Sequence, residues 1–408
     1  MSAIAASTPA VSDAPLAGRV ASRPWVSIAI ETDIAALAER WRLFEATALV
    51  TPYQSYDWVR PFIETIGATH GMALRYALVH GADGKLGALL PLVITRRSGF
   101  RFAEFIGGKH ANYHMGIYAP AFAAQLDARL TEQLLTEIGT AIGGLDALAF
   151  VNQPVIWQGV ANPAARLAAG PSPSRAYKLA LIAGDGDATL KRSMSSHARK
   201  KLKNKHRRFQ DFGPSVLTRA TTPGEAARII DALLTQKAQR FRAMGLPDPF
   251  AEPAMRAFLE RATMDDGSGR SAIELYALDL DGRAVATYVG ARQGERFSGM
   301  ATSFDMASET VKTSPGELLL AELIRLKARE GVAVFDLGVG EARYKTTFCD
   351  DQDDLVDSFL PLTFKGRVFA RIARTKRDLK RRIKRSPAAL KLAYRVSGWL
   401  RGKRPEDD

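Results

Sequence analysis

The chain has 408 residues, of which 46% are hydrophobic and 25% charged, enough apolar material for two globular cores. Its one cysteine, Cys349, excludes a disulfide framework and a thiolate metal cluster, and its six histidines show no metal-ligand spacing, so we expect no metal. The net charge of +14 lies almost wholly in residues 365–404, which hold sixteen Lys and Arg and one acid. The globular part is therefore close to neutral, and we expect no specific DNA binding.

Residues 1–24 are rich in Ala, Ser and Pro and lack the basic and apolar regions of a secretory signal, which predicts a flexible leader. No apolar run reaches the length that spans a bilayer. We therefore expect a cytoplasmic protein.

The first half, residues 25–179, predicts one α/β domain. A helix is expected over residues 34–47 with Asp33 as its N-cap, followed by a hairpin over residues 74–94, where apolar strands flank an Asp-Gly turn. A second helix at 126–142 and a buried strand at 144–151 complete this domain.

Residues 180–364 repeat the same order. A helix at 223–244 follows the N-cap candidate Thr222, a hairpin at 273–290 turns at Asp-Gly, and a helix at 316–330 leads into a strand at 331–338. Repeated elements can arise by coincidence in α/β proteins, but ancient duplication accounts better for the matching order. We predict an α/β fold of two tandem related domains with a basic helical tail.

More specific signals lie in three segments of the second half. They are a basic run with the sequence SMSSHARKKLKNKHRRF at 193–209, SPGELLL at 314–320 and FDLGVGEARYKTTF at 335–348. The first half adds YQSYDW at 53–58, LPL at 90–92 and GGKHAN at 107–112. In this order the segments resemble the CelD-like acyltransferases of the GNAT fold, which are similar to the FemABX ligases with two GNAT-like domains in tandem.

The resemblance implies N-acyl transfer, with acetyl-CoA as the donor and an amino group as the acceptor. Members of the resembled family often accompany exopolysaccharide synthesis, so the expected acceptor is an amino sugar or polysaccharide precursor for a cell-surface polymer such as a holdfast-like adhesin. One alternative is a FemABX-like ligase that uses aminoacyl-tRNA. Another is a non-catalytic scaffold or a sensor of an anionic ligand.

The donor site is expected at the start of the helix near residue 316. Ser314 is suited to the N-cap position, Pro315 to the first turn, and Gly316 allows a ligand to approach the backbone closely. The unpaired amides at a helix start attract phosphate. Glu317 is unfavourable beside a phosphate, so an aminoacyl or other activated acyl group remains an alternative donor. An ordinary capped helix without a ligand is the alternative for the whole motif.

Candidate catalytic residues follow the strand that ends near residue 338, since ligands gather at strand ends in open α/β sheets. Glu341 is the first choice for the base that takes a proton from the amine, and Asp336 is the second. For Asp336, however, capping of the following turn is the favoured role. Tyr344 could protonate the leaving group. Lys345 could hold a phosphate, a carboxylate or an oxyanion, as the resemblance to FemABX ligases implies, while a surface pair is the alternative for both.

Two polar segments have no assigned role. The basic helix around residues 191–208 has nine Lys and Arg and no acid, which is typical of a solvated face, although its place in the family implies an anionic donor or acceptor. His110, Asn112 and His114 either line a cleft between the domains or satisfy their own loop.

The tail, residues 365–408, combines basic residues with an apolar stripe at helical spacing. The stripe consists of Ile372, Leu379, Ile383, Leu390, Tyr394, Val396, Trp399 and Leu400. Such a helix is typical of one that lies on an anionic membrane surface. The alternatives are packing on the enzyme itself, RNA, and an anionic regulatory ligand such as a cyclic dinucleotide. We expect the core domains to fold when residues 365–408 are removed.

Overall fold

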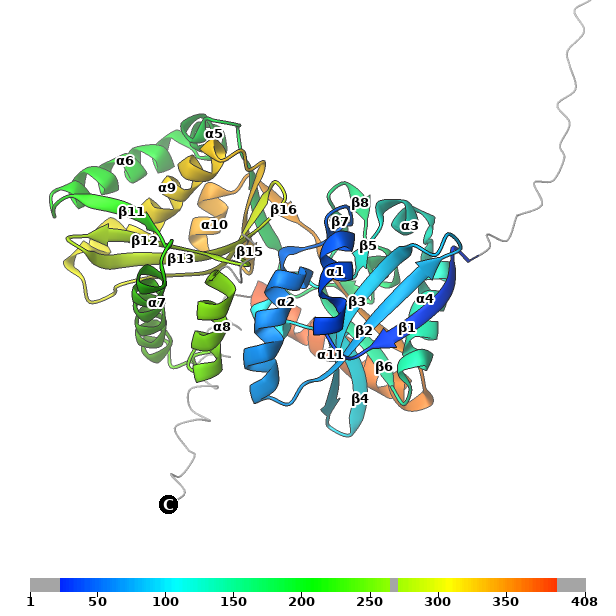
Figure 1. Ribbon diagram of the computed structural model, residues 1–408. Helices are drawn as coiled ribbons and strands as arrows, with labels where there is room; N and C mark the ends of the chain where they lie inside the picture. Colours follow the sequence, from blue (N-terminus) through cyan, green and yellow to red (C-terminus); the bar gives the residue numbers. More distant parts are fainter. Residues whose placement is uncertain (1–22, 265–270, 387–408) are drawn as a thin grey trace, which may run out of the picture.

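Two mixed β-sheets organise the chain, and helices pack against both of them (Figure 1). The computed structural model describes residues 23–264 and 271–386. The two lobes lie side by side, the first drawn in blue to cyan and the second in green to yellow. The prediction of two tandem α/β units is therefore confirmed.

The first sheet has the strand order β1-β2-β3-β4-β6-β17-β9, with β5 paired to β3. Its strands are β1 (Trp25–Glu31), β2 (Ala73–Gly81), β3 (Leu86–Arg97), β4 (Phe100–Phe105), β5 (Ile117–Tyr118), β6 (Ala147–Pro154), β9 (Gly170–Pro171) and β17 (Leu355–Pro361). β2 and β3 form the expected hairpin, and Gly84 in its turn has a φ of +75°, a conformation that glycine adopts without strain.

The helices of the first lobe include the two that the sequence predicts. The helices before β6 are α1 (Ala38–Glu45), α2 (Tyr56–Phe62), α3 (Pro120–Gln125) and α4 (Ala128–Ile142), of which α1 and α4 are the two expected ones. α1 is shorter than expected, because a 3₁₀ turn at Ala35–Leu37 precedes it, and Asp33 accepts a bond from Ala35 N in that turn. α4 carries the chain from β4 to the parallel strand β6.

The second sheet has the order β11-β12-β13-β14-β15-β10-β16. Its strands are β10 (Ala176–Ala180), β11 (Ser215–Arg219), β12 (Glu274–Leu280), β13 (Arg283–Gln293), β14 (Arg296–Phe304), β15 (Val334–Val339) and β16 (Asp351–Asp353). The hairpin of β12 and β13 reverses at Asp281 and Gly282, both at positive φ, as the Asp-Gly pair predicts.

Six helices accompany this sheet in the described part of the chain. They are α5 (Gly186–Ser193), α6 (Ser196–Gln210), α7 (Pro223–Ala243), α8 (Pro253–Thr263), α9 (Pro315–Arg329) and α10 (Arg343–Phe348). α7 begins as predicted at Thr222, which forms a reciprocal capping box with Glu225. α9 leads from β14 into β15, which pairs with β14 in parallel, just as α4 leads from β4 into β6. This shared order agrees with an ancient duplication.

The chain exchanges elements between the lobes near its C-terminal end. β17 (Leu355–Pro361) pairs with β6 and β9 of the first sheet, although residues 180–364 were expected to form the second domain. β10, in turn, begins before residue 180 and lies in the second sheet. The two units therefore do not follow the expected boundaries at residues 180 and 364, because β17 pairs with β6 and β9 in the first sheet and β10 with β15 and β16 in the second.

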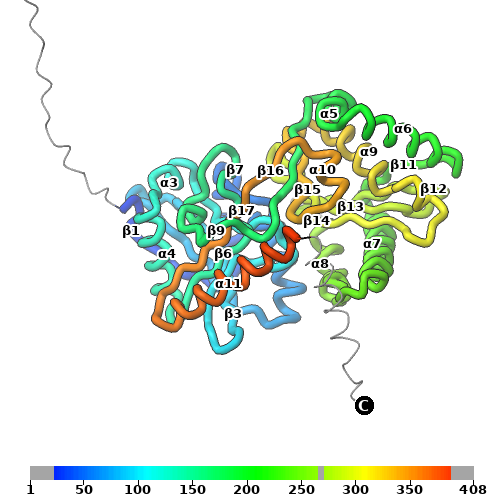
Figure 2. The backbone as a smooth tube through the Cα atoms, turned by 180° about the vertical axis from the view of Figure 1, so that it is seen from behind, coloured from blue at the N-terminus to red at the C-terminus, as the bar shows by residue number. Residues whose placement is uncertain are grey.

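The basic tail begins as a helix on the first lobe, as Figure 2 shows. In α11 (Phe364–Arg385), Phe369 stacks on Phe102 of β4 with ring centroids 4.6 Å apart, and Ala370 joins the same buried cluster. Residues 364–385 therefore fit the alternative in which the tail packs on the enzyme itself, since this helix covers part of the sheet. The apolar positions from Leu390 to Leu400 lie outside the described residues.

Among residues 23–264 and 271–386, no helix is both long and apolar enough to cross a membrane.

Candidate active site

A pocket of about 500 Å³ opens on the second lobe where α7, β14, α9 and α10 meet. Its lining consists of Arg240, Tyr288, Thr302, Phe304, Val311, Ser314, Gly316, Glu317, Leu320, Glu341, Ala342, Arg343 and Tyr344. Four of the seven residues singled out in the sequence therefore lie around one cavity.

The pocket exists because two parallel strands separate. β14 pairs with β15 only from Arg296 to Ser298, opposite Val334 to Asp336. β14 continues to Phe304 and β15 to Val339, so beyond this short ladder the two strands no longer bond to each other. The part of β14 beyond this ladder then carries Thr302 and Phe304 to one wall of the opening, and the chain after β15 carries Glu341 to the other.

The start of α9 forms one wall of the pocket. Ser314 has a left-handed backbone with φ 57° and its side chain caps no amide, so its expected N-cap hydrogen bond is absent. The carbonyl of Ser314 instead accepts bonds from the amides of Glu317 and Leu318. Pro315 occupies the first turn as expected and is buried.

Gly316 gives the pocket an open helix start. A Cβ added at this residue would meet only Phe304 Cδ1, at 3.6 Å, so space remains in front of the backbone. Among the described contacts, the Gly316 amide is not used by another loop or cap. A helix N-terminus with an available amide favours an anionic group.

Glu317 does not leave an isolated negative charge beside this helix start. Lys205 of α6 donates to its carboxylate at 2.6 Å, and the lysine side chain is only 14% exposed. The ion pair therefore neutralises the charge of Glu317, which by itself is unfavourable for phosphate binding.

Glu341 and Tyr344 line the opposite wall. Glu341 is exposed and accepts bonds from Ser174 Oγ at 3.2 Å and from Arg175 N at 3.4 Å. Burial raises the pKa of Tyr344 to about 12, so its hydroxyl is protonated at neutral pH. The pocket thus holds a carboxylate that can accept a proton and a phenol that can donate one.

Lys345 lies beneath the pocket rather than in its lining. Its Nζ donates to the carbonyls of Gly338 and Val339, both at 3.0 Å, and the residue is buried. Burial also lowers its pKa to about 8. These bonds tie α10 to the end of β15, so in this arrangement Lys345 supports the site and does not hold a ligand.

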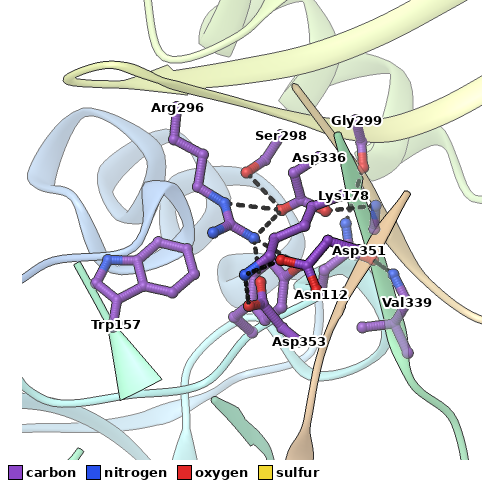
Figure 3. A network of polar contacts seen from close by, with 12 residues as sticks. Asn112, Trp157, Lys178, Arg296, Ser298, Gly299, Asp336, Val339, Asp351 and Asp353 are labelled. Carbon is purple, nitrogen blue, oxygen red and sulfur yellow. Dashed lines mark hydrogen bonds and ion pairs between the residues drawn. The ribbon is translucent and has the colours of Figure 1, made fainter. Parts of the chain in front are cut away.

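Asp336 is fully buried and takes part in a polar network at the junction of the lobes (Figure 3). Its carboxylate pairs with Arg296 at 3.0 Å and accepts bonds from Ser298 Oγ at 2.9 Å and Gly338 N at 2.7 Å. Asp336 does not line the pocket, so the geometry favours the capping alternative over a role as base.

Arg296 connects this network to the first lobe. Its guanidinium lies 4.3 Å from the Trp157 ring centroid and also pairs with Asp353 at 2.6 Å (Figure 3). The charges of Asp336 and Asp353 raise its pKa despite burial. Sequence reasoning missed both Arg296 and Trp157, because neither stands in a motif and their contact joins residues that are distant in sequence.

The polar cluster of the first half divides between two roles. Asn112 reaches the second lobe, where its Nδ2 donates to the Gly299 carbonyl at 2.8 Å and its Oδ1 accepts from Val339 N at 3.3 Å. His114 is buried in its own lobe, with Nδ1 3.0 Å from the Val151 carbonyl oxygen. The cleft-lining interpretation therefore fits Asn112 and the loop interpretation fits His114.

Comparison with known families agrees with this fold. Residues 196–346, which run from the start of α6 into α10 and include all the residues that line the pocket, match the family model described as an acetyltransferase (GNAT) domain. The chain thus carries a GNAT acetyltransferase domain, and its second lobe is an N-acyltransferase unit.

Solved structures extend the likeness to both lobes. FemX is similar with a TM-score of 0.57 and 9% identity, over 82% of this chain and 98% of that one. The C-terminal domain of a putative lysylphosphatidylglycerol synthetase from Agrobacterium fabrum is similar with a TM-score of 0.50 and 10% identity, over 83% and 95% of the two chains. At these identities the likeness shows the fold alone: both lobes of this chain are folded as in FemX. A search of the curated proteins found no match.

Within the described residues, no group of three or more His, Cys, Asp and Glu side chains is arranged to hold a metal ion.

Proposed function

We propose that the second lobe transfers an acetyl group from acetyl-CoA to the amino group of an amino sugar. One observation carries the proposal: the pocket of about 500 Å³ brings the start of α9 together with Glu341 and Tyr344. A place for an anionic donor and a pair of proton-transfer groups therefore share one cavity.

The helix start suits the phosphates of the donor. Gly316 offers an amide with open space before it, and Lys205 neutralises Glu317. Arg240 and Arg343 add two guanidinium groups to the same lining. These groups hold negative charge through charge-assisted hydrogen bonds.

Acetyl-CoA supplies an acyl thioester, which an uncharged amine attacks. Glu341 accepts the proton that the amine loses, directly or through one water molecule. Tyr344, which stays protonated because burial raises its pKa to about 12, donates a proton to the departing sulfur. The proton balance is thus closed by two side chains on the same wall of the pocket, Glu341 before α10 and Tyr344 in its first turn.

The acceptor is inferred from the resemblance to CelD-like acyltransferases, whose members accompany exopolysaccharide synthesis. An amino sugar precursor of a cell-surface polymer would enter from the side of Glu341, which is exposed. The reaction would take place in the cytoplasm, where acetyl-CoA is available.

The donor is tested by calorimetry with acetyl-CoA. Gly316→Glu fills the open space with a carboxylate and should weaken binding more than tenfold, because the anion and the new charge repel. Gly224→Glu is the matched control, since Gly224 also follows a proline in the first turn of a helix and has open space around it. Equal affinity for the Gly316→Glu variant and the unaltered protein would refute the donor site.

A second candidate is a ligase that uses aminoacyl-tRNA, in which case the acyl donor is an aminoacyl ester. The similarity to FemX, which spans 98% of that chain, favours it. Transfer of a radiolabelled amino acid from charged tRNA to a cell-wall precursor, without any use of acetyl-CoA, would establish this candidate in place of the first.

We also propose that α11 brings the enzyme to an anionic membrane surface. Phe364, Val368, Ile372 and Leu379 are exposed along one helix, with Lys and Arg beside them. Apolar insertion and attraction to acidic lipids then act together. The first lobe would hold the enzyme at the cytoplasmic face.

A further inference from the structure

One face of α6 carries an unusual concentration of positive charge. The residues that line a hollow of about 380 Å³ on this face are His197, Lys200, Lys201, Asn204, Lys205 and Arg208, joined by Lys312 from the turn before α9. The five later α6 positions follow His197 by 3, 4, 7, 8 and 11 residues, so all six lie on one face and form a single stripe along the helix. No acidic residue lines this hollow.

The stripe is not explained by ion pairing. Among the described residues, Lys205 pairs with Glu317, whereas Lys200, Lys201 and Arg208 make no ion pair and are exposed. Like charges one helical turn apart destabilise a helix. A helix with seven Lys and Arg and no acid therefore gains stability when an anion lies on this face.

The hollow adjoins the proposed donor pocket. Lys205 lines the hollow and Glu317 lines the pocket, and their side chains are 2.6 Å apart. The neighbouring residues Val311 and Lys312 likewise line the pocket and the hollow. An extended ligand with phosphates at two places could therefore contact both.

We propose that the α6 stripe, with Lys312, is a second phosphate subsite that holds the terminal phosphomonoester of a nucleotide donor. This inference rests on the proposed function, in which the donor's diphosphate lies at the start of α9. A phosphomonoester carries close to two negative charges at neutral pH, more than a diphosphate ester linkage carries on each phosphorus, so it gains most from a cluster of lysines. In CoA this group is the 3′-phosphate of the ribose.

The test compares CoA with 3′-dephospho-CoA by calorimetry on the full-length protein. The unaltered protein should bind CoA about tenfold or more tightly than the dephospho form. Lys200→Glu with Lys201→Glu should remove this preference, and the gentler pair Lys200→Gln with Lys201→Gln should reduce it. Lys203→Glu with Arg207→Glu is the matched control, because it changes the same charge on the same helix outside the hollow.

Three outcomes would overturn the subsite. The first is that the unaltered protein shows no preference for CoA over 3′-dephospho-CoA. The second is that the Lys200 and Lys201 variants lose affinity equally for both ligands. The third is that the control pair lowers the preference for CoA as much as those variants do. The second and third outcomes would indicate a diffuse field that also attracts RNA. Absence of binding by both ligands would instead refute the CoA donor itself, and the subsite with it.

Discussion

The side-chain amide of Asn112 lies between two strands of the other lobe, with Nδ2 2.8 Å from the Gly299 carbonyl oxygen of β14 and Oδ1 3.3 Å from Val339 N of β15. The bridge spans the place where these parallel strands cease to pair. A residue of the first lobe thus joins the two strands where their ladder ends, close to the carbonyls that hold Lys345. The first lobe is part of the architecture of the site.

Replacing Asn112 tests this bridge. Asn112→Ala should lower the free energy of unfolding by about 1–3 kcal/mol, because two backbone groups lose their partner. Asn112→Asp should cost more, since a carboxylate oxygen would face the Gly299 carbonyl. Denaturant unfolding measures both, and Gln125→Ala, whose amide bonds only within its own exposed helix, is the control. Equal stability of Asn112→Ala and the control would contradict the bridge.

Asp336 should be a structural residue. Asp336→Asn leaves the Arg296 guanidinium with less buried negative charge, and breaking a buried pair costs roughly 3–5 kcal/mol. Arg325→Met, which removes surface ion pairs with Asp187 and Glu322, should cost less than about 1 kcal/mol. A stable Asp336→Asn protein that had lost turnover would instead make this carboxylate catalytic. Thermal unfolding alongside an activity assay separates the two.

Glu341 and Tyr344 should control the chemical step. Glu341→Gln is expected to reduce kcat by about a hundredfold or more, and Tyr344→Phe by a similar order, with little effect on donor affinity. Lys345→Met should alter stability more than chemistry, because the lysine is bonded to Gly338 and Val339 beneath the pocket. Full activity of both Glu341→Gln and Tyr344→Phe would show that the acid and base lie elsewhere.

His114 should make the fold sensitive to acid. Burial lowers its pKa to about 4 in the folded protein, against 6.5 in the unfolded chain. Between these values the unfolded chain binds more protons, so stability falls as pH drops from 6.5 to 4, by about 3 kcal/mol. His114→Gln should be less stable at pH 7 but should lose less on acidification. An unchanged slope in His114→Gln would rule out this origin.

Two truncations distinguish the parts of the tail. Removing residues 365–408 deletes α11 and exposes the ring of Phe102 that Phe369 covers, so solubility and thermal stability should fall markedly. Removing residues 387–408 leaves the packed helix in place and should preserve the fold. Co-sedimentation with anionic and neutral vesicles then measures which part binds lipid. Equal melting temperatures for both truncations would mean that α11 contributes nothing to the first lobe.

The sequence by itself determined the local elements. Asp-Gly pairs fixed both hairpins, and Thr222 with Glu225 fixed the start of α7, because these signals act within a few neighbouring residues. Their repeated order, with the three motifs, was enough to predict the tandem fold and to single out Gly316, Glu341 and Tyr344, which share one pocket.

Only the tertiary structure decided how distant residues combine. Leu355–Pro361 joins the first sheet, and Asn112 and Trp157 reach the second lobe, because strand pairing and side-chain packing depend on which surfaces meet and not on separation along the chain. Side-chain packing also decided which of the four catalytic candidates face the pocket. Glu341 and Tyr344 face the pocket, whereas Asp336 and Lys345 turn inward to satisfy Arg296 and the carbonyls at the end of β15.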